Sequence, residues 1–387
     1  MSQLCPICCS PSELVFDLPS LPLTGVLVEI ESLYKDPLLD NALMFCASCS
    51  HGFLANKFSY EILYGGTKQS VTSSSRLARE MNKVFESFIV DVCPNLNSKT
   101  VLEFGAGDLF LANRLKFLTH KYYAVEPSLS AHQADERMSL IGGGVLVEDA
   151  QRYIDTPIDI VIASHCLEHL PDPRSVVRSL AKLLPIDGLF LIEVPDFAPL
   201  ISCSRFDLVF HQHHQYFTFA SLSKLFASEG FGLRACITNP KGFGGGSLLA
   251  SFGRGVGLNF DPTISKSVLL DSLGLFRASV SNLRQQVEMM TSVYKDRVFG
   301  WGASQLVPIL AYHLKSDFSE LAAIIDIDPI KSRYKYPNLK VPIVGPRDVD
   351  LTGCAILITA LDYAEEIASN LPLGPKFVVQ PFANVGF

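Results

Sequence analysis

The segment VFHQHHQYF, residues 209–217, holds three histidines within four positions and then two aromatic residues. Histidine can take up and release a proton near neutral pH because its unperturbed pKa is about 6.5. Three alternatives fit this pattern. In the first, one histidine acts as a general base. In the second, His211 and His213 share one face of a strand, with His214 opposite, and bind a metal. In the third, the histidines are partly solvated and the aromatic pair belongs to the core.

Four of the ten cysteines form two Cys-x-x-Cys pairs, CPIC and CASC. A two-residue gap lets both thiolates turn toward one ion, and two such pairs complete a tetrahedral zinc site. Chance pairs or a redox pair are the alternatives. Because protein ligands fill all four positions, we expect a structural zinc ion, with a hairpin or loop between the pairs. The predicted ligands are Cys5, Cys8, Cys46 and Cys49.

The stretch VLEFGAGDLF, residues 101–110, indicates a strand, a glycine turn and the start of a helix. A dinucleotide site of the form Gly-x-Gly-x-x-Gly requires a third glycine where this chain has Phe110. Glu103 would repel a pyrophosphate but would attract a cofactor that has a cationic amino group and no phosphate. S-adenosylmethionine is such a cofactor. Its predicted contacts in this stretch are Glu103, Gly105, Ala106 and Gly107.

Residues at the ends of the next predicted strands extend this site. Glu126 ends the strand in YAVEPS, where a carboxylate can accept hydrogen bonds from both ribose hydroxyls; the alternative is an exposed acid at a strand end. Asp149 stands where the following strand is expected to end and would border the adenine. His165, after the fourth strand, would face the cofactor. Pro127 and Ala150 complete the predicted cofactor contacts.

A sheet is needed to position these residues. From about residue 73, helical stretches alternate with β-branched or aromatic runs that end at glycine, acidic or proline positions, which is typical of a doubly wound parallel sheet. The predicted strands lie in TVLEFGAG, KYYAVEP, IDIVIASH and GLFLIEVPD. A long amphipathic helix with a break near Gly274 precedes a second, smaller α/β unit. We predict three domains: a zinc-binding domain over 1–72, an S-adenosylmethionine-binding domain over 73–257, and a helical linker with an α/β domain over 258–387.

Composition favours a soluble cytoplasmic protein. Of the 387 residues, 48% are hydrophobic and 18% are charged, which supports a sizeable core. The net charge of -7 gives no reason to expect nucleic acid or an anionic membrane as a partner. No run approaches the ~20 apolar residues of a membrane helix, and no basic, apolar leader begins the sequence.

The order of these features resembles the sugar C-methyltransferase family, which uses S-adenosylmethionine to methylate nucleotide-linked keto-deoxysugars. The resemblance rests on the cysteine pairs, the glycine loop, EHLPDP at 168–173, FHQHHQYFTFASL, GGGSLLASF, GWGAS and DIDPIKSRYKYP, and so covers nearly the whole chain. It implies an α/β fold: a class I methyltransferase sheet, Rossmann-like and doubly wound, between a small N-terminal zinc-binding domain and a smaller C-terminal α/β domain.

The family's segment Tyr-His-Glu-His implies individual roles. His213 falls on the family's proposed base, and His211 on the histidine before it. Phe210 and Gln212 replace the family's Tyr and Glu, and a glutamine cannot take up a proton. Leu109 stands where the family usually has another glycine. The resemblance implies catalytic roles for His213, His211, Gln212 and Tyr64, and substrate contacts from Phe210, Tyr216, Gly245, Gly246 and Ser247.

The implied reaction is removal of a proton beside a ketone by His213, followed by methylation of the enolate carbon. One alternative is a non-catalytic relative that binds nucleotide sugars, since Gln212 has lost the acid. Another is an NAD(P)-dependent oxidoreductase that uses a second glycine turn, Gly300 and Gly302 with Asp326 at the next strand end.

Two further stretches have a structural alternative. Glu168 and His169 are expected to brace the turn before a helix. The glycines at 242–246 either approach the substrate with their N–H groups or form an ordinary tight turn. The sugar, the nucleotide, the methylated carbon and the oligomeric state stay open.

Overall fold

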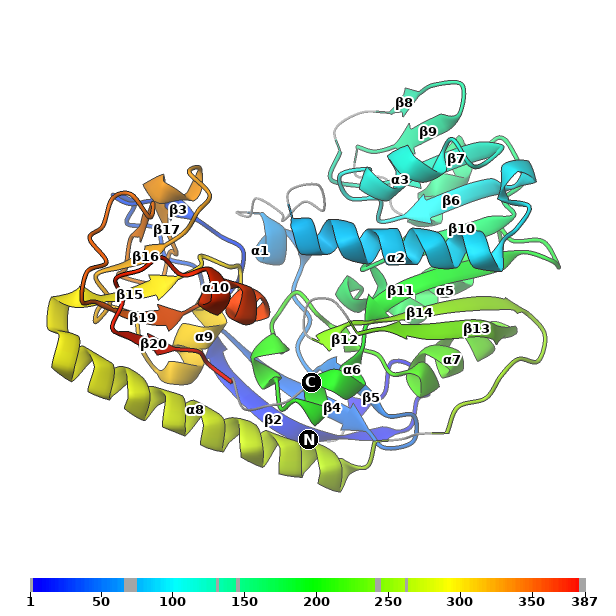
Figure 1. The fold of residues 1–387 in the computed structure, drawn as a ribbon. Helices are drawn as coiled ribbons and strands as arrows, with labels where there is room; N and C mark the ends of the chain where they lie inside the picture. The colour runs from blue at the N-terminus through cyan, green and yellow to red at the C-terminus, as the bar shows by residue number, and fades with distance from the viewer. Residues whose placement is uncertain are drawn as a thin grey trace.

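The computed structural model describes residues 3–65, 75–129, 132–143, 147–240, 245–261 and 264–382. Three larger sheets make up the molecule, and the long helix α8 (Lys266–Tyr294) runs along one side from the N-terminal sheet to the C-terminal one (Figure 1). The predicted domain boundary at residues 72 and 73 lies outside the described residues.

The N-terminal sheet has the strand order β1-β2-β4-β5-β12. The segment between the two cysteine pairs supplies β2 and β4. These two strands pair antiparallel, as expected of the hairpin alternative. The fifth strand, β12, comes from the histidine-rich segment and pairs antiparallel with β5. A stretch from the middle of the chain therefore completes the sheet of the first 54 residues. The bounds are β1 (Gln3–Leu4), β2 (Pro11–Leu21), β4 (Leu39–Cys46), β5 (His51–Leu54) and β12 (Gln215–Tyr216).

The central sheet has the order β13-β14-β11-β10-β6-β7-β9-β8. Strands β11, β10, β6, β7 and β9 are parallel, and β14 is antiparallel to β11. This is the class I methyltransferase arrangement expected from the sequence, and the strands predicted in TVLEFGAG, KYYAVEP, IDIVIASH and GLFLIEVPD are confirmed. The bounds are β6 (Thr100–Phe104), β7 (Lys121–Val125), β8 (Gln133–Ala134), β9 (Met138–Ile141), β10 (Ile160–Ser164), β11 (Leu189–Pro195), β13 (Phe231–Asn239) and β14 (Ser247–Arg254).

Helices cover both faces of this sheet. Apolar residues of α2 and α3 pack on one face, and those of α5 and α7 pack on the other. The parallel strands are consequently apolar along most of their length, as expected for strands buried on both faces. The bounds are α1 (Tyr60–Tyr64), α2 (Arg76–Val92), α3 (Phe110–Leu115), α4 (Val147–Ala150), α5 (Pro173–Ala181), α6 (Phe197–Ser202) and α7 (Phe219–Ala227).

The C-terminal sheet is parallel, with the order β18-β16-β15-β19-β20. The break predicted near Gly274 is wrong: α8 is continuous through it, and a Cβ there would meet nothing within 4 Å, so the glycine lies on an open helix face. The bounds are α9 (Val307–Leu314), α10 (Ala364–Asn370), β15 (Val298–Trp301), β16 (Ala323–Ile325), β18 (Ile343–Val344), β19 (Ala355–Ile358) and β20 (Phe377–Val379), with β3 (Val28–Glu29) pairing with β17 (Tyr334–Lys335).

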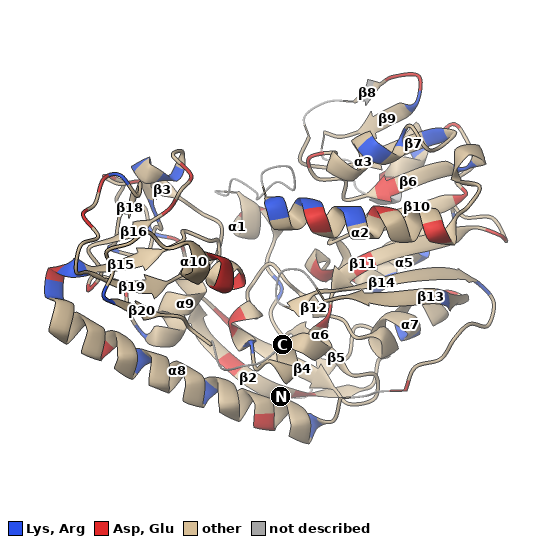
Figure 2. Ribbon diagram, in the orientation of Figure 1, with Lys and Arg blue, Asp and Glu red and all other residues tan. Residues whose placement is uncertain are grey.

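The C-terminal sheet is tied to the central one through charged and polar contacts. In Figure 2 the basic start of α2 faces the acidic helix α10. Arg76 and Glu366 form an ion pair of 2.7 Å across this junction, and the Ser75 and Tyr363 hydroxyls lie 3.0 Å apart. Within the described ranges, none of the helices combines the length and hydropathy that a bilayer span requires.

Candidate active site

The predicted cofactor loop joins β6 to α3 at the carboxyl edge of the central sheet. Gly105 and Gly107 have φ angles of 75° and 52°, a left-handed conformation that glycine adopts without strain. A Cβ on Gly105 would lie 2.6 Å from the sulfur of Cys166, so this position also lacks room for a side chain. Leu109 is left-handed too, with φ 63°, where glycine would fit with less strain. Ala106 is buried between the two glycines.

Glu103, on β6, is buried directly before this loop. It accepts a hydrogen bond from the Tyr122 hydroxyl at 2.8 Å. Burial raises the pKa of Glu103 to about 7; the Tyr122 hydrogen bond opposes this shift, and the charges of Glu126 and Asp108 add to it. A nearby positive charge, such as the amino group of a bound cofactor, would therefore stabilise the ionised form of Glu103.

Glu126, directly after β7, ties the loop to the next strand. One carboxylate oxygen accepts the Gly107 N–H at 2.8 Å, and the other accepts the N–H and hydroxyl of Ser128 at 2.9 and 2.6 Å. A carboxylate has about four lone-pair positions, so further donors such as ribose hydroxyls can still bind. Pro127 continues the chain at this edge.

The predicted position of Asp149 at a strand end is wrong. Strand β9 ends at Ile141, where glycines follow, and Asp149 lies in the short helix α4. Its carboxylate pairs with Arg152 at 3.2 Å, and the neighbouring Ala150 is fully buried. The helix, rather than a strand end, sets the position of both predicted cofactor contacts.

The histidine-rich segment forms a turn at residues 211 and 212, and strand β12 begins only at Gln215, so the single strand face that the metal alternative requires does not form. His211 Nε2 lies 3.0 Å from the Leu21 carbonyl oxygen and must donate to it. The Nδ1 atom then accepts from the Asn41 side chain at 3.1 Å. Both ring nitrogens of His211 are engaged with the N-terminal sheet, which is the environment of a bracing residue.

Gln212 is also held by the N-terminal part of the chain. Its Oε1 accepts the Thr24 hydroxyl at 3.0 Å, and its Nε2 donates to the Thr24 carbonyl at 3.0 Å. Both residues are buried. A glutamate here would set an oxygen against the carbonyl oxygen, so this two-point contact favours an amide and engages both polar atoms of Gln212.

A third link joins the N-terminal sheet to the EHLPDP turn. Gln215 Oε1 accepts from His51 Nε2 at 2.9 Å, and Gln215 Nε2 donates to the Leu170 carbonyl at 2.9 Å. Arg174, at the start of α5, donates to the Ile7 carbonyl at 2.6 Å. The cysteine-bearing sheet therefore holds both the histidine-rich segment and the turn after β10.

Phe210 and Tyr216, predicted to contact the substrate, are buried within the segment. The Phe210 ring lies 4.3 Å from the His213 ring at 37°, and the Tyr216 hydroxyl accepts the Phe210 N–H at 3.2 Å. These contacts fix the ring of His213 from one side, and burial raises the pKa of Tyr216.

His213 is the histidine of the segment that faces the turn after β10. Its ring meets that of His169 edge to face, with centroids 4.9 Å apart. His169 Nδ1 donates to the Gln212 carbonyl at 2.8 Å and lies 3.0 Å from the Tyr64 hydroxyl, so Tyr64 joins the same group. Burial lowers the pKa of His213 well below 6.5, and nearby histidines lower it further. His213 is thus neutral near pH 7, the form that a base requires.

Two buried carboxylates flank His165. Its Nδ1 lies 3.2 Å from Glu168 and its Nε2 lies 3.7 Å from Glu193. Burial alone would lower the pKa of His165, but the two carboxylates outweigh it and raise the pKa to about 10. Glu193 also accepts the Ser164 and Ser247 hydroxyls at 2.7 and 2.9 Å. Sequence reasoning missed Glu193, whose signal was a glutamate inside the apolar strand LFLIEVP.

Among the described residues, possible metal-ligand atoms of Glu168, His169 and His213 lie within 4.8 Å of one another. The three histidines of the segment do not form such a group. A divalent ion at this point would occupy the lone pair with which His213 takes up a proton. The metal and base alternatives therefore exclude each other for His213.

The glycine turn before β14 has structural reasons for its glycines. Gly245 and Gly246 have φ angles of 97° and 113°, and a Cβ on Gly246 would lie 2.0 Å from the Asn239 carbonyl oxygen. The Ser247 hydroxyl is used by Glu193. These contacts suit the tight-turn alternative; residues 242–244 lie outside the described residues.

The four predicted metal ligands come together at the base of the N-terminal sheet. The Cys5 and Cys49 sulfurs are 3.7 Å apart, and those of Cys8 and Cys46 are 3.4 Å apart. Ligands about 2.3 Å from a tetrahedral zinc ion lie roughly 3.8 Å from one another, so the donor set and spacing fit zinc. The hydrogen bond between Cys5 and Cys49 lowers the pKa of Cys5 and raises that of Cys49, so Cys5 is the thiol of this pair that ionises first.

The second glycine turn is internally braced. Asp326 accepts hydrogen bonds from the Ala303 and Asp328 N–H groups at 2.7 and 2.9 Å and from Lys331 at 3.2 Å. Gly302 has φ 96°, and a Cβ there would overlap with Ala360 at 2.3 Å. Close packing against Ala360 accounts for Gly302, and the three hydrogen bonds account for Asp326.

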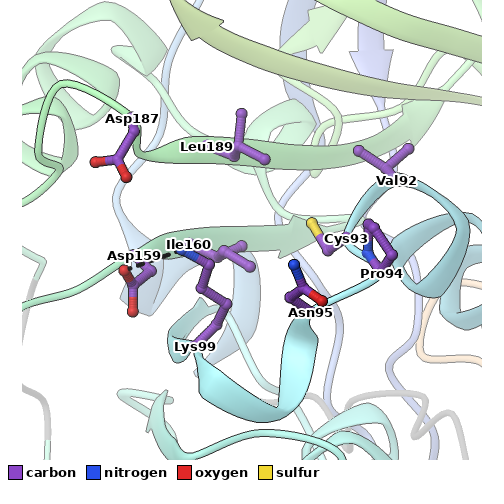
Figure 3. A pocket seen from close by; sticks show the side chains of 9 residues that line it. All are labelled: Val92, Cys93, Pro94, Asn95, Lys99, Asp159, Ile160, Asp187 and Leu189. Carbon is purple, nitrogen blue, oxygen red and sulfur yellow. Dashed lines mark hydrogen bonds and ion pairs between the residues drawn. The ribbon is translucent and has the colours of Figure 1, made fainter.

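A cavity of about 180 Å³ lies at the other edge of the central sheet (Figure 3). It is lined by residues at the amino ends of β6, β10 and β11, including the ion pair of Lys99 and Asp159 at 3.5 Å. Ligands of doubly wound sheets bind outside the carboxyl ends of the strands, so this cavity is separate from the candidate site.

Comparison with known proteins gives matches over the central part and over nearly the whole chain. Residues 75–235 match the family described as "Methyltransferase domain". The chain is 24% identical to C-methyltransferase NovU of Streptomyces niveus over 94% of this chain and 92% of that protein.

Solved structures resemble about half of the chain. One is Burkholderia thailandensis 1,6-didemethyltoxoflavin-N1-methyltransferase with bound S-adenosylhomocysteine, at 17% identity, 47% of this chain, 80% of that chain and a TM-score of 0.35. Another is magnesium protoporphyrin IX methyltransferase of Synechocystis PCC 6803 with bound SAH, at 15% identity, 49% of this chain, 90% of that chain and a TM-score of 0.37.

The domain match and the whole-length similarity to a C-methyltransferase confirm the resemblance found in the sequence. They also confirm the expected enzyme class, an S-adenosylmethionine-dependent methyltransferase.

Proposed function

We propose that the protein methylates a carbon next to the ketone of a nucleotide-linked deoxysugar, with His213 as the base and a structural zinc ion on the four paired cysteines. The carrying observation is that His211 and Gln212 are fixed to the N-terminal sheet, whereas the neutral ring of His213 faces the turn after β10. The similarity to a C-methyltransferase supports carbon as the methyl acceptor.

The cofactor is proposed to lie on the Gly105–Leu109 loop at the carboxyl edge of the central sheet. Glu103 would attract its cationic amino group, and Glu126 would accept its ribose hydroxyls. When bound, S-adenosylmethionine supplies an electrophilic methyl group, which the substrate carbon takes up as the carbon–sulfur bond breaks and its electron pair returns to sulfur.

The residues of this chain prepare the substrate carbon. His213 removes the proton, so the carbon–hydrogen pair becomes the enolate pair and the proton stays on the imidazole. The enolate oxygen needs a hydrogen-bond donor or a positive charge. The Tyr64 hydroxyl and the His165 imidazolium are the proposed sources, since His211 and Gln212 are engaged elsewhere.

The direct test uses His213→Ala with a panel of keto-deoxysugar nucleotides and labelled S-adenosylmethionine. Methyl transfer should be lost, while cofactor affinity measured by calorimetry stays within about twofold of wild type. His120→Ala is the matched control, because His120 is exposed and distant from the site in the chain. Wild-type rates in His213→Ala would refute the assignment.

Two alternatives are separated by binding. A dinucleotide-dependent oxidoreductase would be stabilised by NAD, whereas a methyltransferase would be stabilised by S-adenosylmethionine, each measured as a rise in melting temperature. A non-catalytic relative would bind nucleotide sugars and S-adenosylmethionine independently and transfer no methyl group to any substrate of the panel.

A further inference from the structure

The base needs a compensating negative charge that its neighbour in the chain does not supply. His213 becomes an imidazolium when it takes up a proton, and burial makes that charged form unfavourable. Gln212 is neutral, and Thr24 engages both of its polar atoms. The carboxylate that offsets the imidazolium must therefore come from another element.

Glu168, in the turn after β10, is placed for this task. The residue is 1% exposed. One of its oxygens lies within 4.8 Å of donor nitrogens of both His169 and His213, and Oε1 is 3.8 Å from His169 Nε2. Its Oε2 is buried and has no hydrogen-bond partner among the described residues. An acceptor is thus available for a nitrogen that gains a proton during the reaction.

The charges around Glu168 leave a surplus for His213. The His165 imidazolium lies between Glu168 and Glu193, at 3.2 and 3.7 Å. Two carboxylates thus share one cationic partner. One negative charge is therefore not neutralised within this cluster, and the imidazolium of His213 can use it.

We infer that Glu168 is the positioning carboxylate of the base, in the place that an acidic residue 212 would otherwise take. This rests on the proposed function. The substrate proton moves to His213, the carbon keeps the electron pair, and the Glu168 carboxylate stabilises the imidazolium that forms.

Groups from several elements face this pair and contribute to any pH dependence. His214 belongs to the same segment as His213, Cys166 and His169 lie with Glu168 in the turn after β10, and Glu193 lies on β11. Tyr64, from α1, contacts His169 and also lies in the field of Glu168.

The test compares Glu168→Gln with wild type. We expect kcat to fall on the order of 100-fold, with cofactor affinity unchanged within about threefold. The acid limb of the kcat/KM profile should move about 1–3 pH units lower, because removing a nearby negative charge lowers the pKa of His213. A purely structural role would not move this limb. Glu168→Asp should retain the wild-type limb and part of the rate, and it replaces Glu168→Gln should that variant fail to fold.

Gln212→Glu is the discriminating control. If residue 212 were the assisting position, Gln212→Glu would raise kcat, or it would restore activity when combined with Glu168→Gln. Either result would overturn the inference. So would a Glu168→Gln variant that stays active and keeps the acid limb of the wild type. A wild-type protein that transfers no methyl group would overturn the proposed function and the inference together, so the two failures are distinguishable.

Discussion

The contact between Gln212 and Thr24 makes a sharp prediction for Gln212→Glu. The carboxylate could still accept the Thr24 hydroxyl, but its second oxygen would face the Thr24 carbonyl oxygen across about the 3.0 Å that the amide now spans. Both groups are buried. An unsatisfied buried acceptor costs about 1–3 kcal/mol, and an ionised one costs more. We expect a loss of roughly 2–4 kcal/mol at pH 8, or a melting temperature lower by about 2–5 °C for a chain of 387 residues.

The sign of the pH dependence follows from the same contact. Burial and the carbonyl oxygen would raise the folded-state pKa of the new glutamate above its unfolded value of about 4.3. The destabilisation is therefore absent below the unfolded pKa, where the protonated carboxyl can donate to the carbonyl. It develops as the pH rises and is complete above the folded pKa.

The assay is thermal denaturation of wild type, Gln212→Glu and Gln212→Met between about pH 5 and pH 8. Gln212→Met loses both hydrogen bonds without adding a charge, so its loss of stability should not depend on the pH. The reasoning is refuted if Gln212→Glu matches wild type at pH 8, or if its deficit is the same at every pH.

Three further outcomes are expected. Because the pKa of Glu103 is raised to about 7, calorimetry should show the affinity for S-adenosylmethionine rising from about pH 6 to about pH 8, and Glu103→Gln should remove this dependence. Gly105→Ala should weaken cofactor binding about tenfold or more, because a Cβ would lie 2.6 Å from the Cys166 sulfur at a left-handed φ; unchanged affinity would contradict the loop geometry. Metal analysis should find one zinc ion per chain. Removing the zinc with a chelator should lower the melting temperature and speed amide exchange in β12. Unchanged exchange in β12 would show that the cysteine site does not support this strand.

Strands β6, β7, β10 and β11 of the central sheet could be predicted because each is a short apolar run that ends at a glycine, acidic or proline position. The glycine turn between β6 and α3 could be predicted for the same reason, since its neighbours are close in the sequence. Asp149 was misplaced because nothing in VLVEDAQ distinguishes a strand end from a short helix.

The different surroundings of His211, Gln212 and His213 within the histidine-rich segment could not be predicted. The partners of His211 and Gln212 lie 170 to 190 positions earlier in the chain, and no local pattern reports such contacts. The closeness of Glu168 to His213 could not be predicted for a similar reason, because it depends on how two separate turns meet.

The position of β12 has a consequence for synthesis. Until residue 216 leaves the ribosome, β5 is the unpaired edge of the N-terminal sheet, although that sheet is otherwise complete from residue 54 onward. At about 5–20 residues per second this interval lasts on the order of ten seconds. An open strand edge can pair with other chains during such a delay. Ribosome-bound chains stopped between residues 54 and 216 should therefore be the most prone to aggregate, and the histidine-rich segment ends that exposure when it docks.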